Sequence, residues 1–204
     1  CGGEEERAAT APAAPATSAP SLLVAPATPA PDSLPRGLLL ALAQFVVSPE
    51  GKVLPQPGPA KLEILVRQGG VWKVSVLEDP ESNVFHKAMV YAAPDGPAIL
   101  TLGGTRAALK LWRMGGNGFE AVATLWTKDF GGKFSRMRDA EIADVLGDGR
   151  NGLAVATHDQ GVVATLRPGA DGSVAVAKLD AQKDTIVHEV EVGDLDGDGA
   201  LEVY

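Results

Sequence analysis

The sequence predicts an all-β protein made of short strands joined by tight turns. Glycine (24 residues) and proline (15 residues) recur along the 204-residue chain and interrupt any long helical pattern. Within 71–77, Trp72, Val74 and Val76 alternate with other residues, as expected in a strand, where every second residue points to one face. The order strand, glycine-containing turn, strand occurs three times, at 62–77, 107–125 and 161–179.

The charge balance is acidic, with 26 Asp and Glu against 18 Lys and Arg and a formal net charge of -8. No basic stripe in the sequence could release counterions from a nucleic-acid backbone, so we expect no nucleic-acid partner. The balance is compatible with binding a divalent cation, although solubility alone also accounts for surface acids.

The longest apolar run, 38–47, is about half of the roughly 20 residues that a membrane helix needs. We therefore expect a core strand or a short helix there.

The N-terminal segment 1–34 is rich in Ala, Pro, Thr and Ser, and we expect a disordered tether because it has too little apolar surface to offset its ordering entropy. Cys1 is the only cysteine, so no disulfide can form within the chain. Its context, Cys-Gly-Gly followed by three glutamates, resembles the mature start of a bacterial lipoprotein. The resemblance implies a diacylglycerol on Cys1, a membrane anchor and an extracytoplasmic location in the cell envelope, at the outer membrane. The alternative is a fragment boundary that happens to fall on a cysteine.

A repeat with a period of 50 residues is visible in the remaining segment, 35–204. The stretch 139–149 aligns without gaps on 189–199. A period near 50 with four short strands per unit predicts a partial β-propeller of about three to four blades of four-stranded antiparallel sheets. The expected units are 83–128 and 133–181, with the end of an earlier blade at 35–78 and an incomplete last blade from Ile186. A propeller needs at least four blades to close, so we expect a truncated ring; a solenoid is the main structural alternative.

The stretch 194–202 predicts a Ca²⁺ site. Carboxylates stand at loop positions one, three, five and nine, a glycine at position six permits a sharp turn, and the carbonyl group at position seven can add a ligand. Oxygen-only ligands favour Ca²⁺ over Zn²⁺. The alternative is an Asp- and Gly-rich turn without a metal. The expected ligands are Asp194, Asp196, Asp198, Ala200 and Glu202.

This loop, Asp-x-Asp-Gly-Asp-Gly between two expected strands, resembles the loops of the FG-GAP or VCBS repeat family more than it resembles an EF-hand, which has flanking helices. The resemblance covers roughly 83–204 and implies a β-propeller with Ca²⁺ in its strand-connecting loops, often extracellular. The equivalent loop of the previous unit keeps Asp144 and Asp148, but Leu146 and Gly152 replace the other two acids. We expect a metal-free turn there, with weak metal binding as the alternative.

The repeat alignment places His86, Arg138 and His188 at one position in three successive units, at the start of the innermost strand. In a propeller these residues would share the mouth of the central channel, next to Lys87, Asp139 and Glu189. Such a cluster could bind an anion or titrate near neutral pH, or it could simply fix the packing of neighbouring units. We expect a non-catalytic binding or scaffold module for a protein or glycan. The alternative is a polysaccharide lyase or hydrolase with this cluster at its centre.

Overall fold

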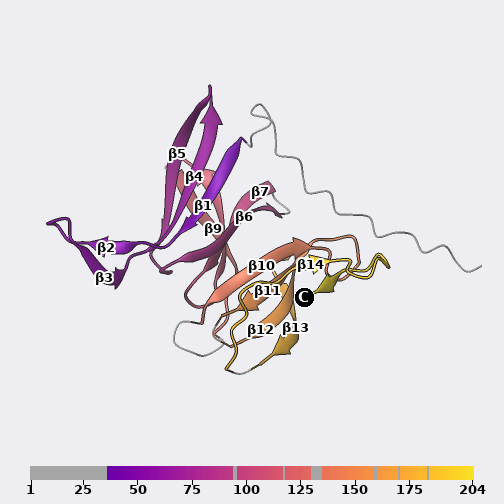
Figure 1. Ribbon diagram of the computed structural model, residues 1–204. Coiled ribbons are helices and arrows are strands. Elements are labelled where there is room, and N and C mark those ends of the chain that lie inside the picture. Colours follow the sequence, from indigo (N-terminus) through magenta and orange to yellow (C-terminus); the bar gives the residue numbers. More distant parts are fainter. Residues whose placement is uncertain are drawn as a thin grey trace, which may run out of the picture. The chain divides into compact units, whose positions relative to one another are not determined.

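The structure is a computed structural model, and it describes residues 36–93, 96–116, 118–129, 135–158, 160–169, 171–182 and 184–204. The expected tether 1–34 and the lipidation of Cys1 lie outside these residues. In the described part of the chain every regular element is a strand, which confirms the all-β class (Figure 1). The strands form several small antiparallel sheets, none of which closes on itself. Across the same residues, no helix is long and apolar enough to span a bilayer.

The first sheet has three strands in the order β1-β4-β5, formed by β1 (Gly37–Leu42), β4 (Ala60–Gln68) and β5 (Val71–Asp79). A separate hairpin pairs β2 (Phe45–Val47) with β3 (Val53–Pro57). The apolar run 38–47 is therefore extended, and the short-helix alternative for it is wrong.

Two four-stranded sheets follow, and in each of them every strand pairs with the next one along the chain (Figure 1). The second sheet of the chain contains β6 (Phe85–Ala93), β7 (Gly96–Gly103), β8 (Leu109–Gly115) and β9 (Gly118–Trp126). The third contains β10 (Met137–Ala143), β11 (Gly152–Thr157), β12 (Val162–Pro168) and β13 (Val174–Ala181). These two sheets lie within the expected units 83–128 and 133–181. A short hairpin of β14 (Val192–Gly193) and β15 (Glu202–Val203) ends the described chain.

The largest apolar core combines side chains of the two four-stranded sheets. Its fully buried members include Leu100, Leu109, Met137, Leu153 and Leu166. Every residue of β11 is buried, which explains why this strand reads as an unbroken apolar run rather than as an alternating one. The outer strands β9 and β13 are mostly exposed. The candidate site residues described below lie mainly in the turns between strands and at the starts of β6 and β10.

Candidate functional site

The predicted Ca²⁺ loop is the turn of the β14–β15 hairpin. Val192 pairs with Val203 and Gly193 with Glu202. One step further out, the Glu191 amide donates to the Tyr204 carbonyl oxygen (2.8 Å) and the Tyr204 amide donates to the Glu191 carbonyl oxygen (3.0 Å). The loop is thus flanked by extended chain on both sides, unlike an EF-hand loop.

Asp194 organises the backbone of this loop. Its two carboxylate oxygens accept hydrogen bonds from the amides of Gly197 (2.7 Å) and Gly199 (2.9 Å). Both glycines have positive φ, at 80° and 90°, a conformation that other residues rarely adopt. The glycines therefore turn their amides inward, and each aspartate oxygen still has a lone pair to offer to a cation.

Three of the predicted ligands converge. Asp194, Asp196 and Glu202 each offer a carboxylate oxygen, and these three oxygens lie within 4.8 Å of one another. The Leu195 amide also donates to Glu202 Oε2 (2.8 Å). This bond keeps the Glu202 side chain close to the start of the loop. Asp198 is not part of this group, and its Oδ1 accepts from the Ala200 amide (2.7 Å). The donor set consists of oxygens only, and its residues are exposed or half-buried, so it suits a hard divalent cation.

The loop between β10 and β11 repeats the same backbone arrangement. Asp144 accepts from the amides of Asp148 (3.1 Å) and Gly149 (2.7 Å), at loop positions five and six, whereas Asp194 accepts from positions four and six. Gly147 and Gly149 have positive φ, at 66° and 79°. The first aspartate therefore shapes the backbone of both loops, with or without a metal. Comparing the two loops only for their metal-ligand residues does not reveal this role.

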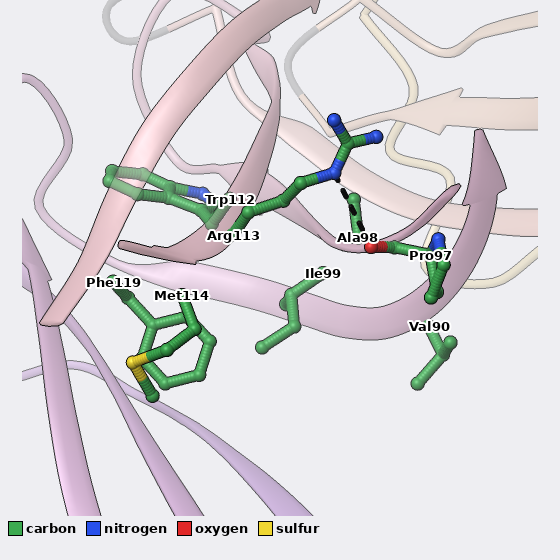
Figure 2. Close-up of a pocket in the computed structure, with 8 residues that line it drawn as sticks. All are labelled: Val90, Pro97, Ala98, Ile99, Trp112, Arg113, Met114 and Phe119. Atoms are coloured by element: carbon green, nitrogen blue, oxygen red, sulfur yellow. Dashed lines mark hydrogen bonds between the residues drawn. The ribbon is translucent and has the colours of Figure 1, made fainter. Parts of the chain in front are cut away.

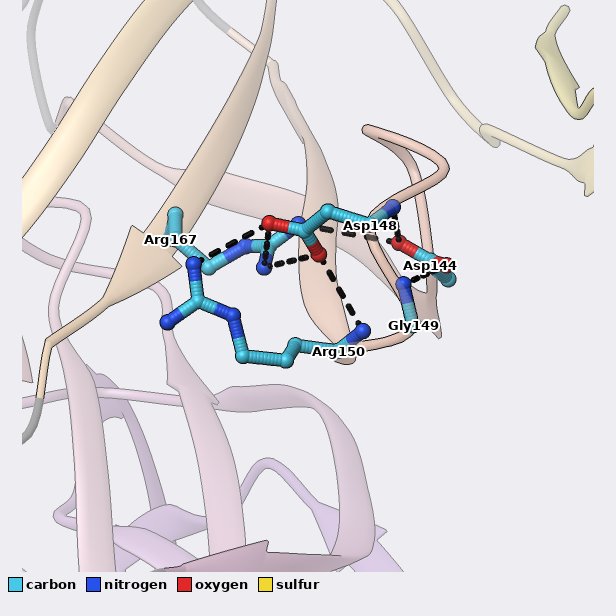
Figure 3. A network of polar contacts seen from close by, with 5 residues as sticks. All are labelled: Asp144, Asp148, Gly149, Arg150 and Arg167. Atoms are coloured by element: carbon cyan, nitrogen blue, oxygen red, sulfur yellow. Dashed lines mark hydrogen bonds and ion pairs between the residues drawn. The ribbon is translucent and has the colours of Figure 1, made fainter.

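The side chain opposite Asp148 is Arg167, from β12 (Figure 3). Its Nη1 donates to both carboxylate oxygens of Asp148, at 2.7 and 2.9 Å, and Arg150 Nη2 donates to Asp148 Oδ2 at 3.0 Å. Hydrogen bonds from Arg167 and then from Arg150 lower the pKa of Asp148 from 3.8 to about 2. Sequence reasoning missed Arg167 because nothing in the chain order links a residue of β12 to this loop.

The lowered pKa of Asp148 predicts a contribution to stability that depends on pH. Because the folded-state pKa (about 2) lies below the unfolded value (3.8), the carboxylate stabilises the fold fully above the unfolded value and loses that effect as pH falls towards the folded value. We expect the melting temperature of the wild type to fall more steeply than that of Asp148→Asn across this window. Thermal unfolding of both proteins at closely spaced pH values measures the difference, and parallel curves would contradict the assignment.

The three residues aligned by the repeat also meet in the structure. Arg138 Nη1 lies 2.9 Å from His86 Nδ1, and Arg138 Nη2 lies 3.3 Å from His188 Nδ1. Since a guanidinium has only donors, both imidazole Nδ1 atoms accept in this arrangement. His158 completes the group through an edge-to-face contact with His188, with 5.9 Å between ring centroids. We call His86, Arg138, His158 and His188 the His–Arg cluster.

A β-bulge places two members of this cluster. The register of β6 with β7 shifts between Phe85 and Lys87, so His86 is the extra residue. The register of β10 with β11 shifts between Met137 and Asp139, so Arg138 is the extra residue. Bulges re-aim side chains out of the regular alternation of a strand. The same irregularity at equivalent positions of both first strands brings His86 and Arg138 to one point.

Charged side chains surround the His–Arg cluster. Lys87 Nζ lies 2.9 Å from Asp139 Oδ1 and also contacts Glu141, and the Val190 amide donates to Asp139 Oδ2 (3.0 Å). Burial disfavours the charged form of Lys87, but hydrogen bonds to Glu141 and Asp139 outweigh it and raise its pKa. Asp139 therefore joins β6, β10 and the segment before β14. No contact brings Glu189 into this group among the interactions that the structure describes.

Replacing Arg138 by glutamine should destabilise the fold. The change replaces the guanidinium that two imidazole nitrogens share by a shorter, uncharged amide that cannot reach both, and we expect a loss of about 1–2 kcal/mol, because hydrogen bonds to charged groups contribute more than neutral ones. Chemical denaturation measures this loss against Lys178→Gln, an exposed charge on β13. Equal midpoints for the two variants would show that the Arg138 contacts contribute nothing to stability.

An open apolar pocket of about 370 Å³ lies on the β6–β9 sheet (Figure 2). Its floor includes Ile99 and the buried Trp112, whose Nε1 donates to Thr101 Oγ1 (2.8 Å). At its rim Arg113 Nε donates to the Pro97 carbonyl oxygen (3.4 Å), and Met114 is exposed. Trp112 packs edge-on against Phe85, at 6.3 Å between ring centroids. It is therefore primarily a core residue that shows one side at the pocket.

Comparison of this chain with protein-family models, with curated proteins and with solved structures found no match.

Proposed function

We propose that this chain is a calcium-binding β-repeat module that presents its turns and sheet faces to a protein or glycan outside the cytoplasm. The observation that carries the proposal is the convergence of Asp194, Asp196 and Glu202 in the turn of a β-hairpin. Three carboxylates at this spacing repel one another, and a divalent cation between them would remove the repulsion. Bound there, Ca²⁺ would supply charge balance and rigidity, with these three residues as its ligands.

The resemblance to FG-GAP and VCBS repeats supports the same proposal, including its propeller form. The Asp-rich loop connects the first strand of a unit to the second, both at 194–201 and at 144–151. Two successive four-stranded sheets of the same strand order are what neighbouring blades would require.

Calorimetric titration of the chain with Ca²⁺ tests the proposal. We expect binding by the wild type, none by Asp196→Ala, and wild-type binding by Asp171→Ala. Asp171 is a suitable control because it is also an exposed turn aspartate, bonded to Ser173 (2.6 Å) and remote from the 194–202 loop in sequence. Absence of Ca²⁺ binding by the wild type would refute the proposal.

The second candidate function, a polysaccharide lyase or hydrolase, rests on the bulges that aim His86 and Arg138 together with His188. The Arg138 guanidinium could neutralise the carboxylate of a uronate, and a neighbouring imidazole could accept or donate the proton. Replacing all three residues separates the candidates. Loss of a glycan-cleaving activity in protein that is still folded at the assay temperature supports the enzyme, whereas a lowered melting temperature with the activity retained supports a packing role.

A further inference from the structure

The two aspartate-rich loops share a backbone fold but differ in their charged partners. In each, the first aspartate accepts two backbone amides, and two glycines have positive φ. The 194–202 loop gathers three carboxylates around one point. In the 144–152 loop only Asp144 and Asp148 remain, and a basic side chain lies against both of them.

That side chain, Arg167, is almost completely buried, with 9% of its surface exposed. Its Nη1 bonds to both oxygens of Asp148, and its Nη2 lies 3.7 Å from Asp144 Oδ1. Figure 3 shows the guanidinium reaching from β12 to the aspartate side of the turn. One guanidinium group therefore contacts the carboxylates at loop positions one and five.

The packing of β12 also explains the missing acid at loop position nine. A Cβ atom added to Gly152 would lie 2.7 Å from the Leu166 carbonyl oxygen and 3.4 Å from Arg167 Nε. The distance to the Leu166 carbonyl oxygen is too short for any side chain at position 152. The distance to Arg167 shows that the arginine fills the neighbouring space. Leu146, at position three, is exposed and under no such restriction.

We infer that Arg167 is the built-in cation of the 144–152 loop: it balances Asp144 and Asp148 and excludes a divalent metal from this loop. A guanidinium matches carboxylate geometry, and its charge at this distance would repel a second cation. The two loops thus reach the same backbone fold by different means, one with an internal arginine and the other with a metal. The comparison between the loops rests on the calcium site proposed above, but the role of Arg167 within its own loop does not.

The first test is made in a chelator, where no metal contributes. Arg167→Met keeps the apolar stem and removes the charge, and we expect the melting temperature to fall by about 2 to 6 °C. Arg150→Met is the matched control, because Arg150 bonds to the same Asp148 carboxylate but its side chain is 71% exposed. We expect little change in the control, since an exposed ion pair contributes little. Equal melting temperatures for the two variants would overturn the inference whether or not the 194–202 loop binds Ca²⁺.

The second test measures metal exclusion by calorimetry in an Asp196→Ala background, which removes the proposed calcium site. Leu146→Asp restores an acid at position three of the 144–152 loop. We expect no Ca²⁺ binding by this variant while Arg167 is present, and binding once Arg167→Met is added. Arg167→Lys serves if the methionine variant does not fold: it keeps the positive charge but loses the guanidinium that reaches both Asp148 and Asp144, and we expect a smaller loss of stability and continued exclusion. Ca²⁺ binding by Leu146→Asp with Arg167 in place would overturn the inference.

Discussion

Calcium is expected to raise the melting temperature of the wild-type chain and to leave that of Asp196→Asn unchanged. A ligand that binds only the folded state stabilises it by about 2.7 kcal/mol at 100 times its dissociation constant. For a chain of this size that corresponds to roughly 5–11 °C. The effect reaches the whole fold because Val190, Val192 and Val203, which flank the loop, pack with Ala154 and Ala156 of β11.

Asparagine is the informative substitution at position 196. Asp196 Oδ1 accepts a hydrogen bond from the Asp198 amide (3.1 Å), and an asparagine oxygen can accept the same bond. The variant therefore keeps the turn and removes one of three converging negative charges.

The difference in melting temperature between the wild type and Asp196→Asn should change sign when the metal is removed. In chelator the wild type has uncompensated repulsion among Asp194, Asp196 and Glu202, so we expect Asp196→Asn to melt at an equal or higher temperature. In Ca²⁺ the wild type should melt higher. Thermal unfolding of both proteins in both buffers tests this crossing. If Ca²⁺ does not change the melting temperature of the wild type, or changes that of both proteins equally, the calcium site is contradicted.

The sequence was sufficient to predict the features that depend on local chemistry. Glycine-rich turns, alternating strands and the 50-residue offset predicted an all-β chain, and the described strands agree. Asp194, Asp196 and Glu202 are close in sequence, so their convergence followed from a sharp turn alone. The meeting of His86, Arg138 and His188 followed from the repeat, because equivalent residues of neighbouring units tend to lie near one another.

Features that depend on contacts between strands could not be predicted. Arg167 lies on β12, and only the antiparallel pairing of β11 with β12 brings it to Asp148. The bulges at His86 and Arg138 are departures from regular pairing that leave no mark in composition. Asp198 was an expected ligand from its spacing; it is not one of the three residues whose carboxylate oxygens lie within 4.8 Å of one another, and its Oδ1 accepts from the Ala200 amide.

Lys110 is another residue whose contacts could not be predicted from the sequence. Lys110 lies on β8 and is buried, with 8% of its surface exposed. Its Nζ lies 2.9 and 2.8 Å from the two carboxylate oxygens of Asp79, and 2.6 Å from Glu81 Oε2. Burial disfavours its charged form, but hydrogen bonds to Asp79 and Glu81 outweigh burial and raise the pKa of Lys110. The charge is therefore retained and joins β8 to the end of β5.

Asp79→Ala should be among the most destabilising single substitutions in this chain. Asp79 has 2% of its surface exposed, and its removal leaves the buried ammonium group of Lys110 with Glu81 alone. Breaking a buried ion pair in this way costs about 3–5 kcal/mol, or roughly 6–20 °C in melting temperature for a chain of this size. Chemical denaturation and thermal unfolding measure the loss directly.

Glu81→Ala is the matched control, since it removes the other carboxylate from the same lysine. The Glu81 side chain is 67% exposed, so its interaction with Lys110 is screened by water, and we expect a much smaller loss than for Asp79→Ala. The double variant Asp79→Leu/Lys110→Met should recover most of the stability lost in Asp79→Ala, because it removes both charges together instead of leaving one buried. Equal losses for Asp79→Ala and Glu81→Ala would mean that water reaches Lys110, and that the junction between β5 and β8 depends on apolar packing rather than on the buried ion pair.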